Sequence, residues 1–320
     1  MADRDARLDG RLVVLLGGSG FFGAHLAQAL LGRGARLRIV SRRTERAFRL
    51  RPLANLGQVQ FVRGDVTQPA NLARAFHGVD AAVHLVGAFS GELDALQGHG
   101  AGRIAALARD AGAGAYVHVS ALGADPASLV DYARTKAEGE QAVRAAFPAA
   151  TILRPSVLFG EDDRFLNMFG GLIARFPALP VFGPAARLQP LHVDDAAEAA
   201  ANALADPLTH GARTYEIAGP EALTMLELNR RIAAAQGRQR LLIEMPDALS
   251  AAFAVATGWL PGAPLSYDQW LLLKSDNVLR GENGLAALGV APRPLALFLD
   301  RWMVRYRNHG RFGTNLGAPG

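Results

Sequence analysis

The chain of 320 residues contains no cysteine and only two lysines. The missing cysteine excludes disulfide bonds and thiolate metal ligands, and it is compatible with a reducing compartment. Arginine replaces lysine almost everywhere, since the 34 lysines and arginines include only those two lysines. The positions that keep lysine, Lys136 and Lys274, are therefore candidates for a role that needs an ammonium group.

The sequence also lacks a hydrophobic leader and an unbroken membrane-spanning run. Its first eleven residues, MADRDARLDGR, are polar and carry both signs of charge, so we expect no secretory signal. The longest uncharged run, residues 248–267, contains two glycines and two prolines and is not expected to cross a bilayer. Its first part places Leu249 and Phe253 on one helical face, which predicts packing against the core or, alternatively, an interfacial helix.

A glycine-rich turn follows the first apolar segment. Residues 12–16 run directly into GGSGFFG at residues 17–23, after which apolar residues recur at helical spacing. A strand, turn and helix in this order aim the free N–H groups of the helix at a site where a pyrophosphate fits. The glycines of GxxGxxG allow the turn, the close approach of phosphate and the packing of helix on sheet. The alternative is a purely structural turn. The predicted cofactor-binding residues here are Gly17, Ser19, Gly20, Phe21, Phe22 and Gly23.

The second predicted strand, residues 35–41, ends in Ser41, Arg42 and Arg43. In dinucleotide folds an acidic residue at this place accepts a hydrogen bond from the 2′-hydroxyl of NAD, whereas arginine accommodates the 2′-phosphate of NADP. Because the acid is missing, the sequence favours NADP(H) over NAD(H). The segment 33–51 has eight arginines and one glutamate, which leaves open a solvated basic face or one that meets an acidic partner or lipid headgroups.

Further strands are predicted at residues 59–65, 79–87, 115–120 and 150–160, alternating with helical segments. This alternation implies right-handed crossovers and a doubly wound parallel sheet, an α/β fold. His84, inside one of these strands, is interpreted as a core histidine. Asp65 is placed to accept from the adenine amino group. The other candidate cofactor contacts at the strand ends are Val66, Val86, Gly87, Pro155 and Val157.

A predicted amphipathic helix at residues 129–147 carries the candidate acid–base pair, Tyr132 and Lys136. Because they are four residues apart, their side chains lie on one helical face. A phenol is a weak acid near neutral pH, and a nearby ammonium favours the phenolate by lowering its pKa. Lysine at this offset can also bind the nicotinamide ribose. The alternative is a surface pair, although one of only two lysines stands here.

These segments resemble the short-chain dehydrogenase/reductase superfamily in its extended or atypical branch, through GGSGFFG, the Asp65 turn, HLVG at residues 84–87 and YARTK at 132–136. The resemblance implies a Rossmann fold, with Tyr132 as acid–base catalyst, Lys136 as ribose clamp and Ser120 as the serine that orients a substrate carbonyl. Two positions depart from the pattern. Leu122 stands where extended members commonly have the catalytic serine, and His99 stands in place of a frequent asparagine.

Later motifs make the chain most similar to the dehydrogenase-like accessory subunit of respiratory complex I, the NADH:ubiquinone oxidoreductase. They are EDDRFLNMF at residues 161–169, QPLHVDDAAEA at 189–199, TYEIAGPE at 214–221 and LLKSDNV at 272–278. The resemblance implies NADPH held mainly for structure, docking on peripheral-arm subunits of complex I, and a cytoplasmic location, peripheral to the anionic inner face of the inner membrane. The alternatives are an active NADP-dependent oxidoreductase or epimerase on a carbonyl or sugar-like substrate, and a redox sensor.

Two structural regions are expected. Residues 1–158, completed by 188–219, form the Rossmann core, and residues 159–187 and 220–320 form a smaller C-terminal α/β lobe and tail. In the lobe, the polar candidates for ligand contact are Arg164, Gln189 and His192, with structural roles as the alternative.

The tail is basic and predicts either a solvated helix end or contact with headgroups or a partner protein. Its arginines are Arg301, Arg305, Arg307 and Arg311. No metal-ligand spacing and no nucleic-acid module is visible in the sequence, so we expect neither a metal nor a nucleic acid as ligand.

Overall fold

The computed structural model describes residues 7–258 and 267–307, and its contacts divide the chain into two compact units. The first unit comprises Met1–Ser156, Val193–Ala218 and Leu279–Pro292. The second comprises Val157–His192, Gly219–Val278 and Arg293–Gly320. The segment Leu279–Pro292, which the sequence had placed in the smaller lobe, joins the first unit because Asn283 binds both the N–H and the carbonyl of Ala218.

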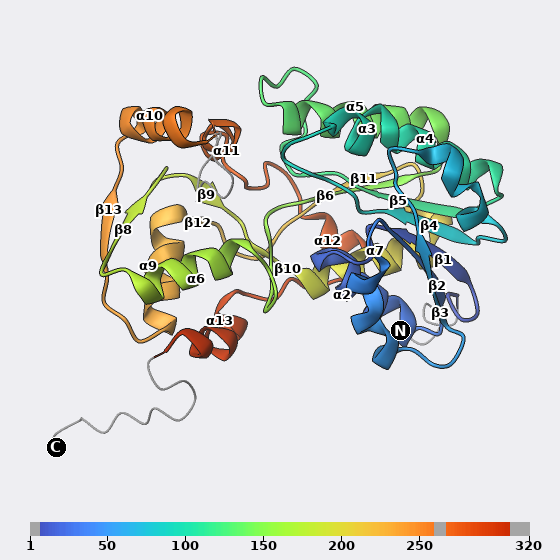
Figure 1. The fold of residues 1–320 in the computed structure, drawn as a ribbon, viewed down its shortest axis with the longest axis horizontal. Helices are drawn as coiled ribbons and strands as arrows, with labels where there is room; N and C mark the ends of the chain where they lie inside the picture. Colours follow the sequence, from blue (N-terminus) through green and yellow to red (C-terminus); the bar gives the residue numbers. More distant parts are fainter. Residues whose placement is uncertain (1–6, 259–266, 308–320) are drawn as a thin grey trace. The chain divides into compact units, whose positions relative to one another are not determined.

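A seven-stranded parallel sheet forms the centre of the first unit, in the order β11-β6-β5-β4-β1-β2-β3 (Figure 1). The doubly wound α/β fold is thereby confirmed. The strands are β1 Leu12–Leu16, β2 Arg36–Ser41, β3 Val59–Arg63, β4 Ala81–His84, β5 Ala115–Val119, β6 Thr151–Pro155 and β11 Thr214–Ile217.

Helices cover both faces of this sheet (Figure 1). One face carries α2 Phe21–Gly32 and α7 Val193–Ala205, and the other carries α3 Leu93–Gln97, α4 His99–Asp110 and α5 Asp131–Ala146. The 3₁₀ segments η1 Thr44–Leu53 and η2 Pro69–Phe76 and the short helices α8 Pro207–His210 and α12 Gly284–Ala287 complete the unit.

The sheet core explains the continuous apolar runs in the sequence. All five residues of β1 and of β5 are buried, as expected for central strands that are covered on both faces. Val14, Leu16 and Tyr116 share one face and pack with Ile104 of α4 and Val143 of α5. This packing places the carboxyl ends of β1, β2, β4 and β5 at one edge, where the predicted cofactor residues lie.

The predicted strand at 150–160 is divided into two. β6 ends at Pro155, and β7 Leu158–Phe159 pairs instead with β10 Leu191–His192 in the second unit. The chain changes partner because the N–H of Val157 donates to Asn277 Oδ1 and its carbonyl accepts from Leu191.

The second unit has a separate hydrophobic core that includes Phe159, Leu166, Leu228 and Trp302. Its remaining elements are α6 Phe165–Arg175, β8 Ala178–Val181, β9 Arg187–Leu188, β12 Leu223–Thr224, α9 Met225–Ala235, β13 Leu241–Glu244, α10 Asp247–Thr257, α11 Tyr267–Leu273, α13 Ala296–Met303 and η3 Val304–Tyr306. No helix in the described part of the chain has both the length and the hydropathy needed to cross a membrane.

The predicted core face of α10 is partly wrong. Phe253 stacks on Phe182, but Leu249 is exposed, and the buried positions of the helix are Ser250 and Ala254. Small residues are buried here because α10 packs closely against α11, where Trp270 fills the shared cluster with Ala254.

Candidate functional site

The glycine turn forms an open cradle at the N-terminus of α2. Gly17 has φ +86°, a backbone conformation that favours glycine, and a Cβ at Gly23 would lie 2.5 Å from Gly17 O. Helix and turn therefore touch, as the GxxGxxG interpretation requires. Gly20 is the exposed N-cap of α2, no side chain caps the helix, and its first turn has no acidic residue. These features fit a pyrophosphate group at the free N–H groups of the helix.

Two serine hydroxyls link this turn to the end of β2. Ser19 Oγ lies 2.8 Å from Ser41 Oγ, and the N–H of Arg43 donates to Ser41 Oγ at 3.2 Å. The side chains of Arg42 and Arg43 are exposed, and no carboxylate in the described residues forms an ion pair with either. An NAD-specific site would carry an acidic residue at the end of β2. Here β2 ends in Ser41, whose hydroxyl contacts Ser19 of the glycine turn, and Arg42 and Arg43 follow it.

Arg49 is a residue of this site that the sequence analysis did not select. It lies on η1 and donates through Nη2 to the carbonyl of Gly20 at 3.2 Å. The basic segment 33–51 was the only sequence signal for it, because eight arginines in one segment do not reveal which of them folds back onto the turn.

Two of the residues predicted to contact the adenine, Asp65 and Val66, use their side chains for contacts within the protein. Asp65 Oδ1 accepts from both the N–H and the hydroxyl of Thr67, which fixes the turn after β3. The Val66 side chain is buried in the sheet core, so only its backbone is available to a ligand. Val86 touches the turn directly, since a Cβ on Gly17 would lie 3.1 Å from Val86 Cγ2.

Lys136 lies at the carboxyl ends of β4 and β5, as the ribose interpretation requires. Its side chain is 3% exposed, and Nζ donates to the carbonyl of Val119 at 3.0 Å. A Cβ on Gly87 would approach Nζ to 3.0 Å, so the structure brings Gly87 and Lys136 together. Burial lowers the pKa of Lys136 to about 8, against a smaller opposing effect of the Glu140 carboxylate.

Tyr132 shares this face of α5, but its environment differs from the one predicted. Phe89, itself 54% exposed, stacks on the phenol ring with a centroid distance of 4.4 Å and an interplanar angle of 23°. Burial raises the pKa of Tyr132 to about 12. The lowering of this pKa that was expected from the Lys136 charge is not found in the cofactor-free chain, because desolvation of the phenol raises it.

Ser120 follows Val119 directly, and its buried hydroxyl makes no hydrogen bond in the described residues. A buried hydroxyl without a partner is costly, which makes Ser120 Oγ a candidate for a ligand contact. Leu122 is half-buried, and its N–H donates to the carbonyl of Pro155. Pro155, another predicted contact, thus lies in the same strand-end cluster.

A buried histidine pair lies at the ends of β4 and β5. His84 and His118 are register partners whose rings stack within 9° of parallel, with 3.2 Å between the two Nδ1 atoms. Burial, followed by the charge of Lys136, lowers the pKa of His84 to about 3, and burial also lowers that of His118. Both rings are therefore neutral, and the interpretation of His84 as a core histidine agrees with its position.

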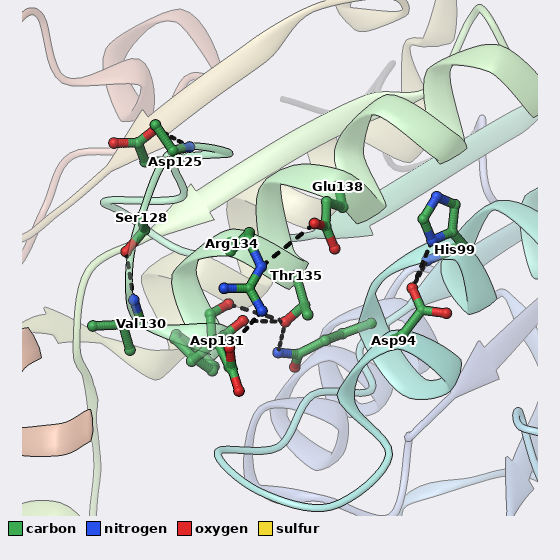
Figure 2. Close-up of polar contacts among 12 residues, drawn as sticks. Asp94, His99, Asp125, Ser128, Val130, Asp131, Arg134, Thr135 and Glu138 are labelled. Atoms are coloured by element: carbon green, nitrogen blue, oxygen red, sulfur yellow. Dashed lines mark hydrogen bonds and ion pairs between the residues drawn. The ribbon is translucent and has the colours of Figure 1, made fainter. Parts of the chain in front are cut away.

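His99, which stands in place of the frequent asparagine, is exposed at the start of α4. It binds Asp94 through its ring and its N–H, and in Figure 2 this pair lies apart from Asp131 and Thr135 of α5. Gln97 occupies the buried place instead: it accepts from the N–H of Ala88 and donates to Thr135 Oγ1. The sequence did not reveal it because Gln97 ends the short helix α3, a separate element that was not predicted ahead of α4.

The remaining candidates belong to the second unit. Val157 is its first residue, and Gln189 donates to the carbonyl of Gly219. His192 accepts from Arg293 and stacks on Phe298 at 3.8 Å, whereas Arg164 forms the start of α6. In the described residues no group of three or more histidines, aspartates or glutamates is arranged to hold a metal ion.

The parallel sheet, the uncapped glycine turn and the Tyr132–Lys136 face define a dinucleotide-binding protein of the short-chain dehydrogenase/reductase type. The chain belongs to the NAD dependent epimerase/dehydratase family, whose model matches residues 13–218.

Proteins similar to this chain have names that state different functions. The chain is 33% identical over 222 residues to "NADH dehydrogenase [ubiquinone] 1 alpha subcomplex subunit 9, mitochondrial" of Dictyostelium discoideum, which covers 67% of this chain and 61% of that protein. The protein of that name from Arabidopsis thaliana is 28% identical, covering 97% and 81%. A ceramide reductase of Caulobacter vibrioides is 33% identical, covering 78% of each chain.

Solved structures share the fold. A triphenylmethane reductase from Citrobacter sp. in complex with NADP(H) has a TM-score of 0.70 at 19% identity, covering 91% of this chain and 99% of that one. A dTDP-glucose 4,6-dehydratase from Streptomyces venezuelae with bound NAD also has a TM-score of 0.70, at 22% identity, covering 92% and 96%. At these identities the likeness concerns the fold.

Proposed function

We propose that the chain is an accessory or assembly subunit of respiratory complex I and that it binds NADP(H) mainly as a structural element. The proposal rests on a difference between the phosphate-binding turn and the acid–base residue of the same site. The phosphate turn is open and uncapped, whereas the half-buried Tyr132 ring stacks on Phe89 and the pKa of Tyr132 is raised. A site that can hold a cofactor but whose acid–base group is stacked on a neighbouring ring and hard to ionise suits retention better than turnover. The relatives named as complex I subunits support the same assignment.

NADP(H) is the proposed cofactor in preference to NAD(H), because Ser41, Arg42 and Arg43 end β2 without an acidic residue. Arginine binds a 2′-phosphate through charge-assisted hydrogen bonds, and the same cations gain nothing from a 2′-hydroxyl. The double variant Arg42→Ala with Arg43→Ala should weaken NADPH binding by roughly 10- to 100-fold and NADH binding by much less. Calorimetry with both nucleotides measures the difference, and equal weakening would remove the preference.

The test of the assignment is purification from native membranes in mild detergent. A tagged chain should recover complex I subunits, and it should do so in a Tyr132→Phe variant as well, because the proposal gives the phenol no role in assembly. Recovery of the chain alone would reject the assignment. We further propose a location on the cytoplasmic side, peripheral to the inner membrane.

A second candidate function is an active NADP-dependent oxidoreductase or epimerase on a carbonyl or sugar-like substrate. It is favoured by the buried Ser120 hydroxyl beside Val119, the residue whose carbonyl binds Lys136. The ceramide reductase relative points the same way. When bound, a nicotinamide would supply the hydride, Lys136 would hold its ribose and Ser120 would bind the substrate oxygen. Turnover of NADPH with a carbonyl panel that Tyr132→Phe abolishes would establish this function over the first.

A further inference from the structure

The ribbon formed by β8 and β13 has an apolar outer face. Leu242, Leu179 and Val181 point into the core of the second unit. Because side chains alternate along a strand, Leu241 and Ile243 point the opposite way, and they are 64% and 44% exposed. In the pairing register they stand opposite Ala178 and Pro180 of β8, so the outer face carries four apolar side chains.

Phe176 extends this outer face. It is 51% exposed, it lies two residues before Ala178, and its extended backbone leads into β8. The N–H of Leu241 donates to the carbonyl of the next residue, Pro177, which holds β13 beside this corner. Clustered exposed apolar side chains on a folded chain indicate a contact surface, whereas single ones do not.

Arginines lie beside the same strand, on the side to which Leu242 points and where α9 packs. A groove of about 440 Å³ is lined by Arg230, Arg238 and Arg240 together with Leu242. Arg240 directly precedes Leu241 and donates through Nε to the carbonyl of Ile173, while Arg238 donates to the carbonyl of Tyr306. The carbonyl of Ile173 holds the Arg240 guanidinium in place without neutralising its charge.

The charge of this groove is not balanced by neighbouring acids. No carboxylate in the described residues forms an ion pair with Arg230 or Arg240, whereas the adjacent Arg231 is paired with both Glu221 and Glu227. Glu227, three residues before Arg230, is paired with Arg231, and Glu244, the acid nearest to Arg240 in the sequence, stands at the far end of β13. Long arginine side chains can extend past one strand while their stems cover apolar surface.

Two of the tail arginines have partners of their own. Arg305 lies near the Glu161 carboxylate, and Arg307 donates to the carbonyl of Ala235 and lies near Asp300. Arg301 is exposed on α13, and Arg311 lies outside the described residues. The α9–β13 groove, in contrast, brings three arginines together in one place.

We propose that the outer face of the β8–β13 ribbon, with Arg230 and Arg240 beside it, is the surface through which the chain contacts an anionic phospholipid bilayer. Phosphate groups would meet the arginines, and the apolar side chains would enter the acyl boundary. The positive charge of Arg230 and Arg240 favours an anionic bilayer as the partner of this surface, because arginines that form no ion pair with a carboxylate in the described residues attract its phosphate groups while the ribbon supplies apolar contact. The inference deepens the proposed peripheral location and does not depend on membership of complex I.

The test is flotation of the full chain with vesicles of phosphatidylcholine, with and without phosphatidylglycerol. Only vesicles that contain phosphatidylglycerol should bind, and binding should fall as salt is raised. Arg230→Glu changes the charge by two without removing a carbonyl contact. At about fivefold for each charge near the surface, it should weaken partition by roughly 25-fold. Leu241→Ser with Ile243→Ser should also reduce binding.

Matched controls are exposed residues elsewhere on the chain. Arg187→Glu makes the same charge change on β9, and Leu208→Ser removes an exposed leucine from α8. Both should bind as the wild type does, and circular dichroism should show all variants folded.

Equal loss of vesicle binding in the Arg187→Glu control would overturn the proposal, because net charge alone would then explain the binding. Binding that inorganic phosphate abolishes at constant ionic strength would assign the groove to a soluble phosphate ligand instead. Association with complex I that is lost in the ribbon variants, with no vesicle binding by the wild type, would make this surface a protein interface and would equally overturn the bilayer assignment.

Discussion

Lys136→Met should make the cofactor-free protein more stable and a poorer binder of NADP(H). The wild-type ammonium is 3% exposed, and burial lowers its pKa from 10.5 to about 8. A lowering of that size corresponds to about 3 kcal/mol of unfavourable burial for the charged form. Methionine removes this cost but also loses the hydrogen bond to Val119, which is worth about 1 kcal/mol. We therefore expect a net gain of about 1–2 kcal/mol at pH 7.

The pH dependence has a definite sign. Between pH 10.5 and about 8 the unfolded chain binds a proton that the folded chain does not, so wild-type stability should fall as the pH is lowered through this window. Lys136→Met should lack that component. Chemical denaturation at several pH values measures both effects, with Lys274→Met as the matched control because Lys274 is half exposed.

Two lysines also make a direct titration possible. In protein labelled with carbon-13 at the lysine Cε atoms, Lys274→Met leaves a single resonance, which should titrate near pH 8. A Lys136 resonance that titrates near its ordinary value of 10.5, or a Lys136→Met protein less stable than the wild type with an unchanged pH slope, would refute the reasoning.

Three further predictions follow from the same site. Stability should fall by about 1.4 kcal/mol per pH unit as the pH drops from 6.5 toward 3, because only the unfolded chain protonates His84 there, and His118, whose pKa burial also lowers, should make the fall steeper. Replacing His84 and His118 by leucine should flatten this slope in urea titrations. Gly23→Ala places a Cβ 2.5 Å from backbone atoms and should cost about 2–4 kcal/mol, whereas Gly32→Ala on the same helix meets nothing within 4 Å and should be neutral or stabilising in thermal melts. Phe89→Ala should lower the pKa of the covered tyrosine from about 12, as followed by ultraviolet absorbance, and an unchanged titration would exclude Phe89 as its cover.

The sequence could predict the part of the fold that depends on local pattern. Buried parallel strands read as continuous apolar runs, and the glycine spacing at Gly17 and Gly23 reflects a contact that only glycine permits. The strand at 150–160 shows the limit, because its division depends on Asn277, a residue more than a hundred positions away.

The sequence predicted which residues form the site, but it did not predict what surrounds each of them. Tyr132 and Lys136 share one face of α5, as their spacing requires. Spacing does not reveal that Phe89 stacks on the phenol or that Val119 binds the ammonium, and it does not reveal the desolvation that raises the pKa of Tyr132. Gln97 was missed for a similar reason, since its burial depends on contacts with Ala88 and with Thr135 of α5.

The most direct test of the central claim is the identification of nucleotide released from the chain after purification from its native membranes. Mass spectrometry of the denatured protein should find NADP(H) in nearly equimolar amount, retained through extensive dialysis. A chain that releases NAD(H), or that is empty after dialysis yet turns over added NADPH, would contradict a structural role for the phosphorylated cofactor.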